Sequence, residues 1–546
     1  MKNVFIGGAW PYANNSMHIG HLAALLPGDV LARYFRMDGK NVIYVSGSDC
    51  HGTPITQRAQ SLGVSPEYIA KHYHEEFSKY FNDLLFTYDI YSNTMTLKHK
   101  TNVQNILKEI NEKGFLFEKT ELNDYCPKCQ KFVVDREIKG ICPVCGSEAN
   151  GDQCDKCLTS LTPEMLRDKT CKICGTKTIL KEDTNLYFKL SAFEDIIKTY
   201  LDKNKQSWRP TAINETQKYL NQGLVDRAIT RALDWGIELP FEGYKDKRVY
   251  VWIDAVLGYL TTCEMACEEK SIEYPEFLKS NDTISYYVHG KDNIVFHTII
   301  LPALLDAIDE NLNKPQKIVS CEYVNLNNDK MSKSKGNLIT VNTLLSNFDP
   351  DSIRYFFIFN NPERKDCSFS LEDFVLIHNK HIVGGFGNFA NRNLAFLEKK
   401  FEGKLPKVNL DESIVKYVTD TYTEIGKLFE AGELKTACTK LYDYIQFANK
   451  YYDTNTPWTF AKTDKDKFDE ITSNCLYLMA NMANLYSPIM PKGCQKLKDI
   501  LGVKENAWKP VCYDDSVTIE NVQVLYQRLK LEDIDMSKGA KDTLNI

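Results

Sequence analysis

Two short signatures that lie far apart in the sequence constrain the fold of this chain more than any other feature. The first is HIGH at residues 18–21, which follows an apolar, strand-like run and opens a helical pattern. The second is KMSKS at residues 330–334, which follows another apolar run and continues as a Lys/Ser/Gly stretch. A chain that brings both segments to one crevice builds a site for a nucleoside triphosphate, approached from two sides.

Each signature offers a way to hold phosphate. His18 and His21 open a helix and project on one side, and Gly20 between them lets a phosphate or a flat ring approach the backbone. The helix N-terminus adds a preference for anions. Lys330 and Lys333 can close over a triphosphate and follow the charge that moves onto the leaving pyrophosphate. Surface histidines and a solvated lysine run are the alternatives, and the presence of both signatures in one chain argues against them.

Strand and helix patterns alternate over the first part of the chain and again after the middle. The predicted strands are residues 4–6, 42–45, 249–252, 286–288 and 318–319. This layout is typical of a doubly wound α/β sheet of the Rossmann type, split here by an insertion. Such sheets bind ligands at the carboxyl ends of their strands, where we place His18, Asp49, Asp254 and Asp292.

The insertion contains eight of the 17 cysteines, arranged as four C-x-x-C pairs. Two such pairs complete a tetrahedral site of four thiolates, so eight ligands predict two structural zinc ions with no open position for catalysis. A redox role is the alternative, but repeated pairs in a loop-rich insertion are not typical of it. Spacing does not determine which pairs share an ion; we favour one ion for the two inner pairs and one for the two outer pairs. The pairs are Cys126/Cys129, Cys142/Cys145, Cys154/Cys157 and Cys171/Cys174.

After residue 387 the pattern becomes helical almost to the end. Apolar residues recur at spacings of three and four, which predicts an all-helical bundle, and a polar tail from about residue 516 must pack back on the body or remain loose. The periodic positions are Ile414, Val418, Tyr422, Ile425 and Phe429; Leu434, Cys438, Leu441, Ile445 and Ala448; and Phe468, Ile471, Cys475, Met479 and Met482.

Composition excludes several classes of protein. A net charge of −6 gives no global basic field, which argues against a nonspecific DNA-binding protein and restricts any RNA contact to a local surface. No apolar run approaches the roughly 20 residues that span a bilayer, and the N-terminus lacks a signal-peptide pattern. We therefore expect a cytoplasmic protein that does not bind membranes or DNA.

Further motifs strengthen the two signatures. The sequence contains AWPYAN at 9–14, DCHGTP at 49–54, YVWIDA at 250–255 and GKD at 290–292 followed by FH at 296–297. Together with HIGH and KMSKS, these motifs resemble the class I aminoacyl-tRNA synthetases, and among them the methionyl-tRNA synthetases of bacterial type. The resemblance covers essentially the whole chain. It implies a split Rossmann-type parallel sheet, a zinc-binding connective insertion and a C-terminal all-helical bundle that binds the anticodon.

By this resemblance the chain divides into six parts. They are the first half of the catalytic domain (1–117), the connective insertion with zinc knuckles (118–226), the second half of the catalytic domain (227–325), the KMSKS and stem-contact region (326–385), the anticodon-binding bundle (386–515) and a tail that packs back on the body (516–546).

The resemblance also implies a methionine pocket. Aromatic walls suit a soft, polarizable thioether, and a carboxylate such as Asp49 suits the substrate ammonium group. The sequence departs from some family members at Val256, where they have proline, and at Asn293, where they have an apolar residue. The positions that match the pocket are Ala9, Trp10, Tyr12, Asp49, Trp252, Ala255, Tyr259, Asp292 and His297.

The implied reaction is the activation of methionine by ATP to methionyl-adenylate and pyrophosphate, followed by transfer to initiator and elongator tRNA(Met). Mg²⁺ accompanies ATP, and the catalytic residues are the two histidines and two lysines of the signatures. The residues that match the ATP site are His18, Gly20, His21, Lys330, Ser332 and Lys333.

Three residues of the helical region match the family's anticodon-reading positions: Asn388, Arg392 and Trp458. An exposed tryptophan beside asparagine and arginine suits single-stranded bases, which are read by stacking and by hydrogen bonds to their edges. No further RNA-binding or dimerisation domain follows the tail, so we expect a monomer.

Three alternatives remain at this stage. Synthetases for isoleucine, valine or leucine carry an editing insertion far larger than residues 118–226 of this chain. A cysteine-specific enzyme would place zinc in the amino-acid pocket, whereas the four-cysteine sets of this chain leave no open position on the metal. The third is a zinc-bearing RNA-binding protein on an inactive synthetase scaffold, against which the intact His18, His21, Lys330 and Lys333 argue.

Overall fold

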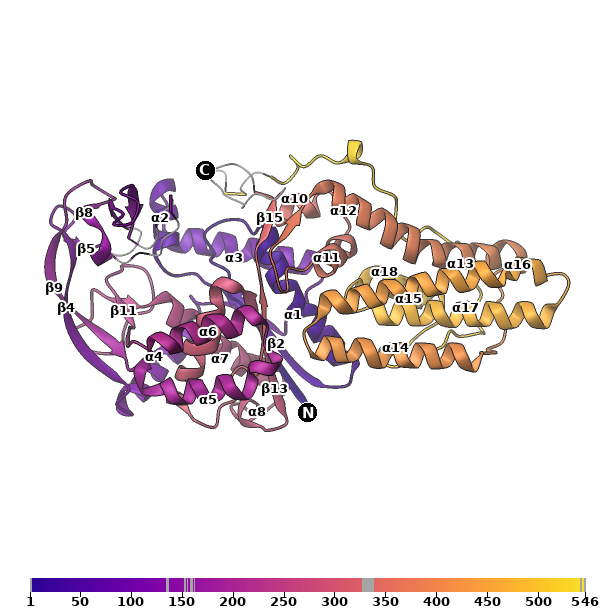
Figure 1. Cartoon of the computed structure of the whole chain (residues 1–546), viewed down its shortest axis with the longest axis horizontal. Coiled ribbons are helices and arrows are strands. Elements are labelled where there is room, and N and C mark those ends of the chain that lie inside the picture. Colours follow the sequence, from indigo (N-terminus) through magenta and orange to yellow (C-terminus); the bar gives the residue numbers. More distant parts are fainter. Residues whose placement is uncertain are drawn as a thin grey trace.

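The computed structural model describes residues 2–133, 137–151, 154, 156–157, 161, 163–326, 338–540 and 543–544. The molecule is elongated, with an α/β body at one end and a helical bundle at the other (Figure 1). The tail after the bundle returns along one side toward the α/β body, so its last described residues lie near α2 and α10 rather than at the tip of the bundle. The bounds of these two helices are Thr53–Leu62 (α2) and Val341–Leu345 (α10).

A five-stranded parallel sheet forms the centre of the α/β body, in the order β14-β13-β1-β2-β3. All four pairings are parallel, and β1 of the first half pairs with β13 of the second, so the insertion splits the sheet as predicted. Ligands bind such sheets where the strand order reverses. The bounds are β1 (Asn3–Gly8), β2 (Asn41–Ser48), β3 (Ile90–Asn93), β13 (Thr283–Gly290) and β14 (Lys317–Cys321).

Alternate side chains of each strand enter two separate cores, because successive residues of a strand point to opposite faces. Val4 and Ile6 face the core that includes α1 (Ile19–Met37), whereas Phe5 faces the core that includes α7 (Val251–Lys270). Both faces are therefore apolar, and this explains why the strands read as continuous hydrophobic runs. The remaining helices of the body are α3 (Pro66–Asp83), α4 (Leu97–Glu112), α8 (Glu276–Lys279) and α9 (Leu301–Ile308).

The prediction of a sheet strand at 249–252 is wrong. Only Arg248–Val249 (β12) is extended, and it pairs antiparallel with Thr230–Arg231 (β11) outside the main sheet. Val251 already begins α7, which is buried around most of its circumference. A short apolar run of this kind cannot be distinguished from the start of a buried helix by its periodicity. Asp254 consequently lies in the first turn of α7 and not at the end of a strand.

The insertion is built on a long antiparallel pair, β4 (Leu116–Cys126) and β9 (Ile179–Phe188). This pair extends away from the body and carries the cysteine clusters at its far end (Figure 1). Two helices, α5 (Glu194–Asn204) and α6 (Pro210–Gln222), lead back to the body. The short strands are β5 (Lys131–Phe132), β6 (Ile138–Ile141), β7 (Glu148–Asn150), β8 (Arg167–Cys171) and β10 (Arg227–Ala228).

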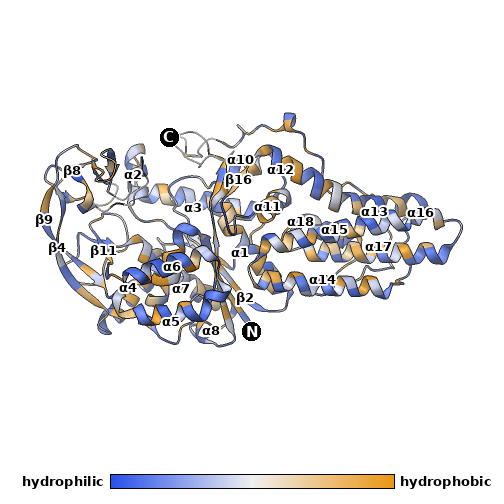
Figure 2. Cartoon of the chain, in the orientation of Figure 1, coloured by the Kyte–Doolittle hydropathy of each residue, from blue (hydrophilic) through white to orange (hydrophobic). Residues whose placement is uncertain are grey.

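The helical bundle has its apolar positions where the periodicity placed them. The residues predicted for three helical faces are buried in α14, α15 and α17, and hydropathy alternates around these helices (Figure 2). The bounds are α11 (Pro350–Phe359), α12 (Leu371–Ile377), α13 (Asn388–Phe401), α14 (Glu412–Glu430), α15 (Leu434–Asn455), α16 (Pro457–Phe460), α17 (Lys465–Tyr486) and α18 (Pro491–Ile500). A π-helical segment, His378–Gly387, joins α12 to α13, and β15 (Val324–Leu326) pairs with β16 (Cys367–Phe369) beside the body.

The tail is held by hydrogen bonds along its length. Tyr526 donates to the buried carboxylate of Asp351, and the carbonyl of Gly539 accepts from the Thr340 hydroxyl. Farther along, Thr543 donates to Glu76 of α3, which also accepts from Ser16 at 3.1 Å. The tail therefore contacts the segment after KMSKS directly and is linked to the segment before HIGH through Glu76.

A buried ion pair connects the body to the bundle. Arg354 of α11 is 0% exposed and lies 2.6 Å from Asp29 of α1. Its remaining donors reach the carbonyls of Leu84, Pro488 and Ile489 at 2.9–3.0 Å. Burial alone would raise the pKa of Asp29, but the charges of Arg354 and Arg33 hold it below its usual value. Both charges are thus fully compensated.

We predict that Arg354→Met lowers the free energy of unfolding by about 3–5 kcal/mol, because it leaves the Asp29 carboxylate buried without its main partner. Urea unfolding followed by circular dichroism measures this loss. Lys416→Met, which removes an exposed ion pair with Asp420, is the control and should cost about 0.5 kcal/mol or less. Equal costs for the two variants would contradict the assignment.

Candidate functional site

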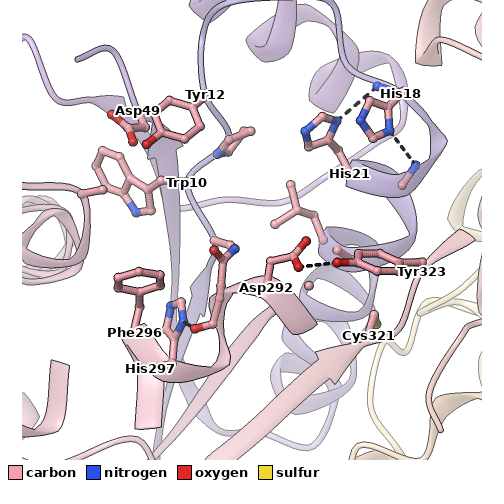
Figure 3. A pocket seen from close by; sticks show the side chains of 18 of the residues that line it. Trp10, Tyr12, His18, His21, Asp49, Asp292, Phe296, His297, Cys321 and Tyr323 are labelled. Atoms are coloured by element: carbon pink, nitrogen blue, oxygen red, sulfur yellow. Dashed lines mark hydrogen bonds between the residues drawn. The ribbon is translucent and has the colours of Figure 1, made fainter. Parts of the chain in front are cut away.

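A cavity of about 600 Å³ opens at the carboxyl ends of the central strands (Figure 3). The segments that follow β1, β2, β13 and β14 all contribute to its walls. Every residue that the sequence assigned to a methionine pocket lines this cavity, as do His18, Gly20 and His21. The roles of these residues remain predictions, but one cavity does bring them together.

The two histidines of the HIGH signature close the N-terminus of α1 as a reciprocal cap. Nδ1 of His18 accepts from the backbone N–H of Gly20 at 3.1 Å, and Nδ1 of His21 accepts from the backbone N–H of His18 at 3.3 Å. The ring centroids are 4.0 Å apart, and both rings lie on one side of the cavity (Figure 3). Because each Nδ1 is an acceptor, each neutral ring has its proton on Nε2.

The KMSKS signature lies outside the described residues, including Lys330, Ser332 and Lys333, but both of its flanks are described. Asn325 before it and Leu338 after it line the cavity. The flank after it pairs with the HIGH segment: the N–H of Ile19 donates to the Ile339 carbonyl at 3.1 Å, and that of Val341 donates to the Met17 carbonyl at 2.8 Å. Both described segments that flank the signature therefore lie at the cavity.

An aromatic wall surrounds one end of the cavity. The indole of Trp252 donates to the Tyr12 hydroxyl at 2.6 Å and meets the ring of Phe296 edge-on at 4.3 Å. The ring of Trp10 packs on Gly47 and Gly258, where an added Cβ would lie 2.5–2.6 Å from the ring. Since no real Cβ comes that close, both positions require glycine for Trp10 to keep its place.

Asp49 provides a buried negative group at the same end. It is 2% exposed, and backbone hydrogen bonds from Asp49 to Pro11 and from Ala13 to Asp49 fix it beside Tyr12. Burial, and then the charge of Asp254, raise the pKa of its carboxyl well above the usual value. Among the described residues, no lysine or arginine pairs with it. A bound cation would relieve both effects.

His297 is held as a neutral ring in a π-helical segment, Phe296–Ile300. Its Nδ1 donates to the Asn293 carbonyl at 2.8 Å, so its Nε2 accepts from the Tyr259 hydroxyl at 2.9 Å. Burial lowers the pKa of His297 to about 4, which keeps the ring uncharged near pH 7. Tyr259 is thereby oriented with its hydroxyl proton toward His297. π-Helical turns are frequent at functional sites.

The cavity also contains residues that sequence reasoning missed. Tyr323 donates a short hydrogen bond to Asp292, and the amine of Lys291 lies 3.9 Å from the centre of the Tyr323 ring. Tyr323 could have been predicted from its position just after β14, because ligands bind such sheets at the carboxyl ends of the strands. Phe296 belongs to the FH motif at 296–297, but its role was not predicted from the sequence. Val256 and Asn293, the two departures from the family, both line the cavity as well; the other missed lining residues are Pro11, Ala24, Leu25, Gly290, Cys321, Glu322, Val324, Asn325 and Leu338.

Two clusters of four cysteines lie at the end of the β4–β9 pair. The inner two pairs form one cluster and the outer two pairs form the other, which is the pairing that we favoured. Within the clusters, Sγ atoms of different pairs are 3.4–3.9 Å apart. A tetrahedral site with Zn–S bonds of about 2.3 Å separates its sulfurs by about 3.8 Å. The thiolate donors and their spacing therefore fit zinc.

The three predicted anticodon residues all contact the C-terminal part of α15, and Figure 1 shows α13 and α16 in the part of the bundle away from the body. The guanidinium of Arg392 lies 4.7 Å from the centre of the Tyr452 ring, and the centre of the Trp458 ring lies 5.3 Å from the same point. Asn388 donates to Asn449 at 3.3 Å one helical turn before Arg392. Trp458 is 43% exposed, so part of its side chain is accessible.

Among the described residues, no helix is both long enough and apolar enough to cross a membrane.

Comparisons with known proteins agree along the chain. A family model described as tRNA synthetases class I (M) matches residues 4–394, and one described as anticodon binding domain of methionyl tRNA ligase matches residues 406–524. Methionine–tRNA ligase 1 of Alkaliphilus oremlandii is 45% identical over 98% of this chain and 99% of its own length. Methionine–tRNA ligase of Bacillus cereus (strain B4264) is 43% identical over 98% of each chain.

The fold also resembles a solved structure. Mycobacterium tuberculosis methionyl-tRNA synthetase in complex with methionyl-adenylate superposes with a TM-score of 0.78 at 23% identity, over 97% of this chain and 100% of that one. At this identity the likeness concerns the fold alone.

We predict that the protein purified with its native metal content contains two zinc ions per chain, because the two clusters are separate four-thiolate sets. Cys145→Ser should reduce this to one, and Cys129→Ser should do the same at the other cluster. Atomic absorption on desalted protein measures the content, and Cys512→Ser, which changes an exposed cysteine outside the clusters, is the control. Retention of two ions in either cluster variant would exclude that cluster.

Proposed function

The chain belongs to the methionyl-tRNA synthetases of class I, and from this premise we propose how its own residues perform the reaction. As a methionine–tRNA ligase it joins methionine to tRNA at the expense of ATP. The observation that carries the assignment of roles is the single cavity that joins an aromatic wall, a buried carboxylate and the histidine-capped start of α1.

Methionine binds at the aromatic end of the cavity. The Asp49 carboxylate receives the ammonium group, whose charge relieves the burial of Asp49. The thioether lies among Trp10, Trp252 and Tyr259, since sulfur contacts aromatic rings favourably. Ala9, Tyr12, Ala255, Asp292 and His297 complete the walls. His297 acts through Tyr259, whose orientation it holds while uncharged.

ATP binds across the opening of α1. The methionine carboxylate attacks the α-phosphorus in line, methionyl-adenylate forms, and pyrophosphate leaves. No protein nucleophile is needed, so catalysis consists of positioning and of stabilising charge. His18 and His21 donate from Nε2 to the phosphates, and Gly20 permits their close approach. Lys330, Ser332 and Lys333 cover the triphosphate from the opposite side, and Mg²⁺ enters with ATP as part of that substrate.

The adenylate then passes methionine to the terminal adenosine of tRNA(Met), initiator and elongator alike, at the 2′-hydroxyl in the manner of class I. Asn388, Arg392 and Trp458 read the anticodon at the far end of the bundle. Two zinc ions, bound by the eight cysteines, stabilise the insertion and take no part in the chemistry, because each four-thiolate set is closed. We further propose that the enzyme acts as a monomer in the cytoplasm.

We predict that only methionine, among the natural amino acids, supports rapid ATP–pyrophosphate exchange, and that Lys333→Ala slows it by at least roughly 100-fold, the loss expected for one preorganised charge donor. Lys335→Ala changes a neighbouring lysine outside the signature and should alter the rate by less than about threefold. An unchanged rate in Lys333→Ala would remove this residue from the mechanism.

Trp458→Ala should leave exchange intact and lower kcat/KM for charging of tRNA(Met) by about 10- to 100-fold, since base stacking on an aromatic ring is worth about 1–3 kcal/mol. Tyr68→Ala, at an exposed aromatic residue of α3, is the control and should change neither reaction. A parallel fall of exchange and charging in Trp458→Ala would show that the anticodon assignment is wrong.

A further inference from the structure

A buried carboxylate that the proposed reaction does not use lies close to Asp49. Asp254, in the first turn of α7, is 0% exposed, and each of its oxygens meets an imidazole. Oδ2 lies 2.6 Å from Nδ1 of His51, and Oδ1 lies 2.8 Å from Nε2 of His99. The other nitrogen of His99 is 2.9 Å from the hydroxyl of Thr261. The cluster therefore joins the segment after β2 to α4 and α7.

The two imidazoles serve Asp254 as hydrogen-bond donors. Nε2 of His51 is buried without a hydrogen-bond partner among the described residues, so a proton on that nitrogen would be unsatisfied. His51 can therefore donate from Nδ1 with a single proton, and His99 can likewise donate from Nε2. Burial favours the protonated form of Asp254, but the contacts with His51 and His99 outweigh it and hold the pKa below its usual value. Asp254 consequently remains a carboxylate.

His51 connects this carboxylate to Asp49. Its backbone N–H donates to Oδ1 of Asp49 at 3.3 Å, while its side chain binds Asp254. The negative charge reaches the cavity: burial and then the charge of Asp254 raise the pKa of Asp49. The pKa values of Tyr12 and Cys50 are also raised, first by burial and then by the charges of Asp49 and Asp254. One small region thus holds two carboxylates, of which only Asp49 lines the cavity.

Resting on the assignment of Asp49 to the substrate ammonium group, we propose that Asp254, held by His51 and His99, is a positioning residue that makes this end of the cavity selective for a cationic α-amino group. Two neighbouring carboxylates without a cation repel each other in a poorly hydrated site. An ammonium group at Asp49 relieves that repulsion, whereas a neutral hydroxyl in its place does not. Asp254 thereby adds to the binding of methionine without touching it.

The test compares methionine with its α-hydroxy analogue, 2-hydroxy-4-(methylthio)butanoate, which keeps the thioether and the carboxylate but lacks the positive charge. Asp254→Asn should raise the KM for methionine in ATP–pyrophosphate exchange about tenfold, the effect of about one pKa unit of charge interaction. The kcat, the KM for ATP and the inhibition constant of the hydroxy analogue should each change by less than about twofold.

Two comparisons separate the possible failures. Asp351→Asn neutralises another buried carboxylate, on α11 and outside the lining of the cavity, and should leave the KM for methionine unchanged. Asp49→Asn should weaken methionine binding by itself. If it does not, the ammonium assignment falls with the proposed function; if it does and Asp254→Asn has no effect, only the present inference falls. Equal weakening of methionine and of the hydroxy analogue by Asp254→Asn would show a purely structural role.

A second pair of variants decides the question if Asp254→Asn does not fold. His51→Asn places an amide N–H where Nδ1 donates and should keep the KM for methionine within about twofold of the parent enzyme. His51→Leu removes the donor and should raise it about tenfold, again with little effect on the hydroxy analogue. Identical values for the two His51 variants would overturn the proposal.

Discussion

The positively charged guanidinium of Arg354 is buried at the point where the body meets the bundle, so the fold must provide partners for its charge. Its partners come from three segments: Asp29 in α1, the carbonyl after α3 and the two carbonyls between α17 and α18. An unpaired buried charge costs several kcal/mol, so these segments must keep their relative positions. The N-cap of the same α1 is His18, on the wall of the cavity. The end of the helix that we propose to bind phosphate is thereby fixed relative to the bundle that carries the predicted anticodon residues.

The backbone pairing between residues 17–19 and 339–341 adds a second constraint at the cavity. It joins the start of HIGH to the segment that follows KMSKS, although most of the chain's α/β body lies between them in sequence. The carbonyl of Gly539 accepts from Thr340 in this pairing, so the tail also reaches the site. The cavity is therefore bounded by segments from the beginning and the middle of the sequence, and the tail contacts a segment next to it.

Much of this arrangement could be predicted because it rests on local patterns. Apolar strands buried on both faces, C-x-x-C pairs and three- and four-residue spacing each have a direct physical cause, and the sheet, the two cysteine clusters and the helices of the bundle follow from them. The prediction of a strand at 249–252 failed because a buried helix and a buried strand can begin with the same apolar residues. The contacts of Asp254 could not be predicted, since His51, His99 and Asp254 come from three unconnected segments with no shared period. For the same reason, the partners of Arg354, a buried arginine within the apolar helix α11, could not be predicted.

The packing of Trp10 on Gly47 and Gly258 has a consequence for how this site can vary under selection. A side chain at either glycine would occupy the space of the indole, so neither position can change unless Trp10 changes with it. A compound that displaced methionine by binding against this indole would face few single-step routes to resistance there. Val256 and Asn293 also line the cavity, and these are the two positions where the sequence departs from some family members. Trp10 and its two glycines can therefore change only together, whereas Val256 and Asn293 are the positions where related enzymes can differ.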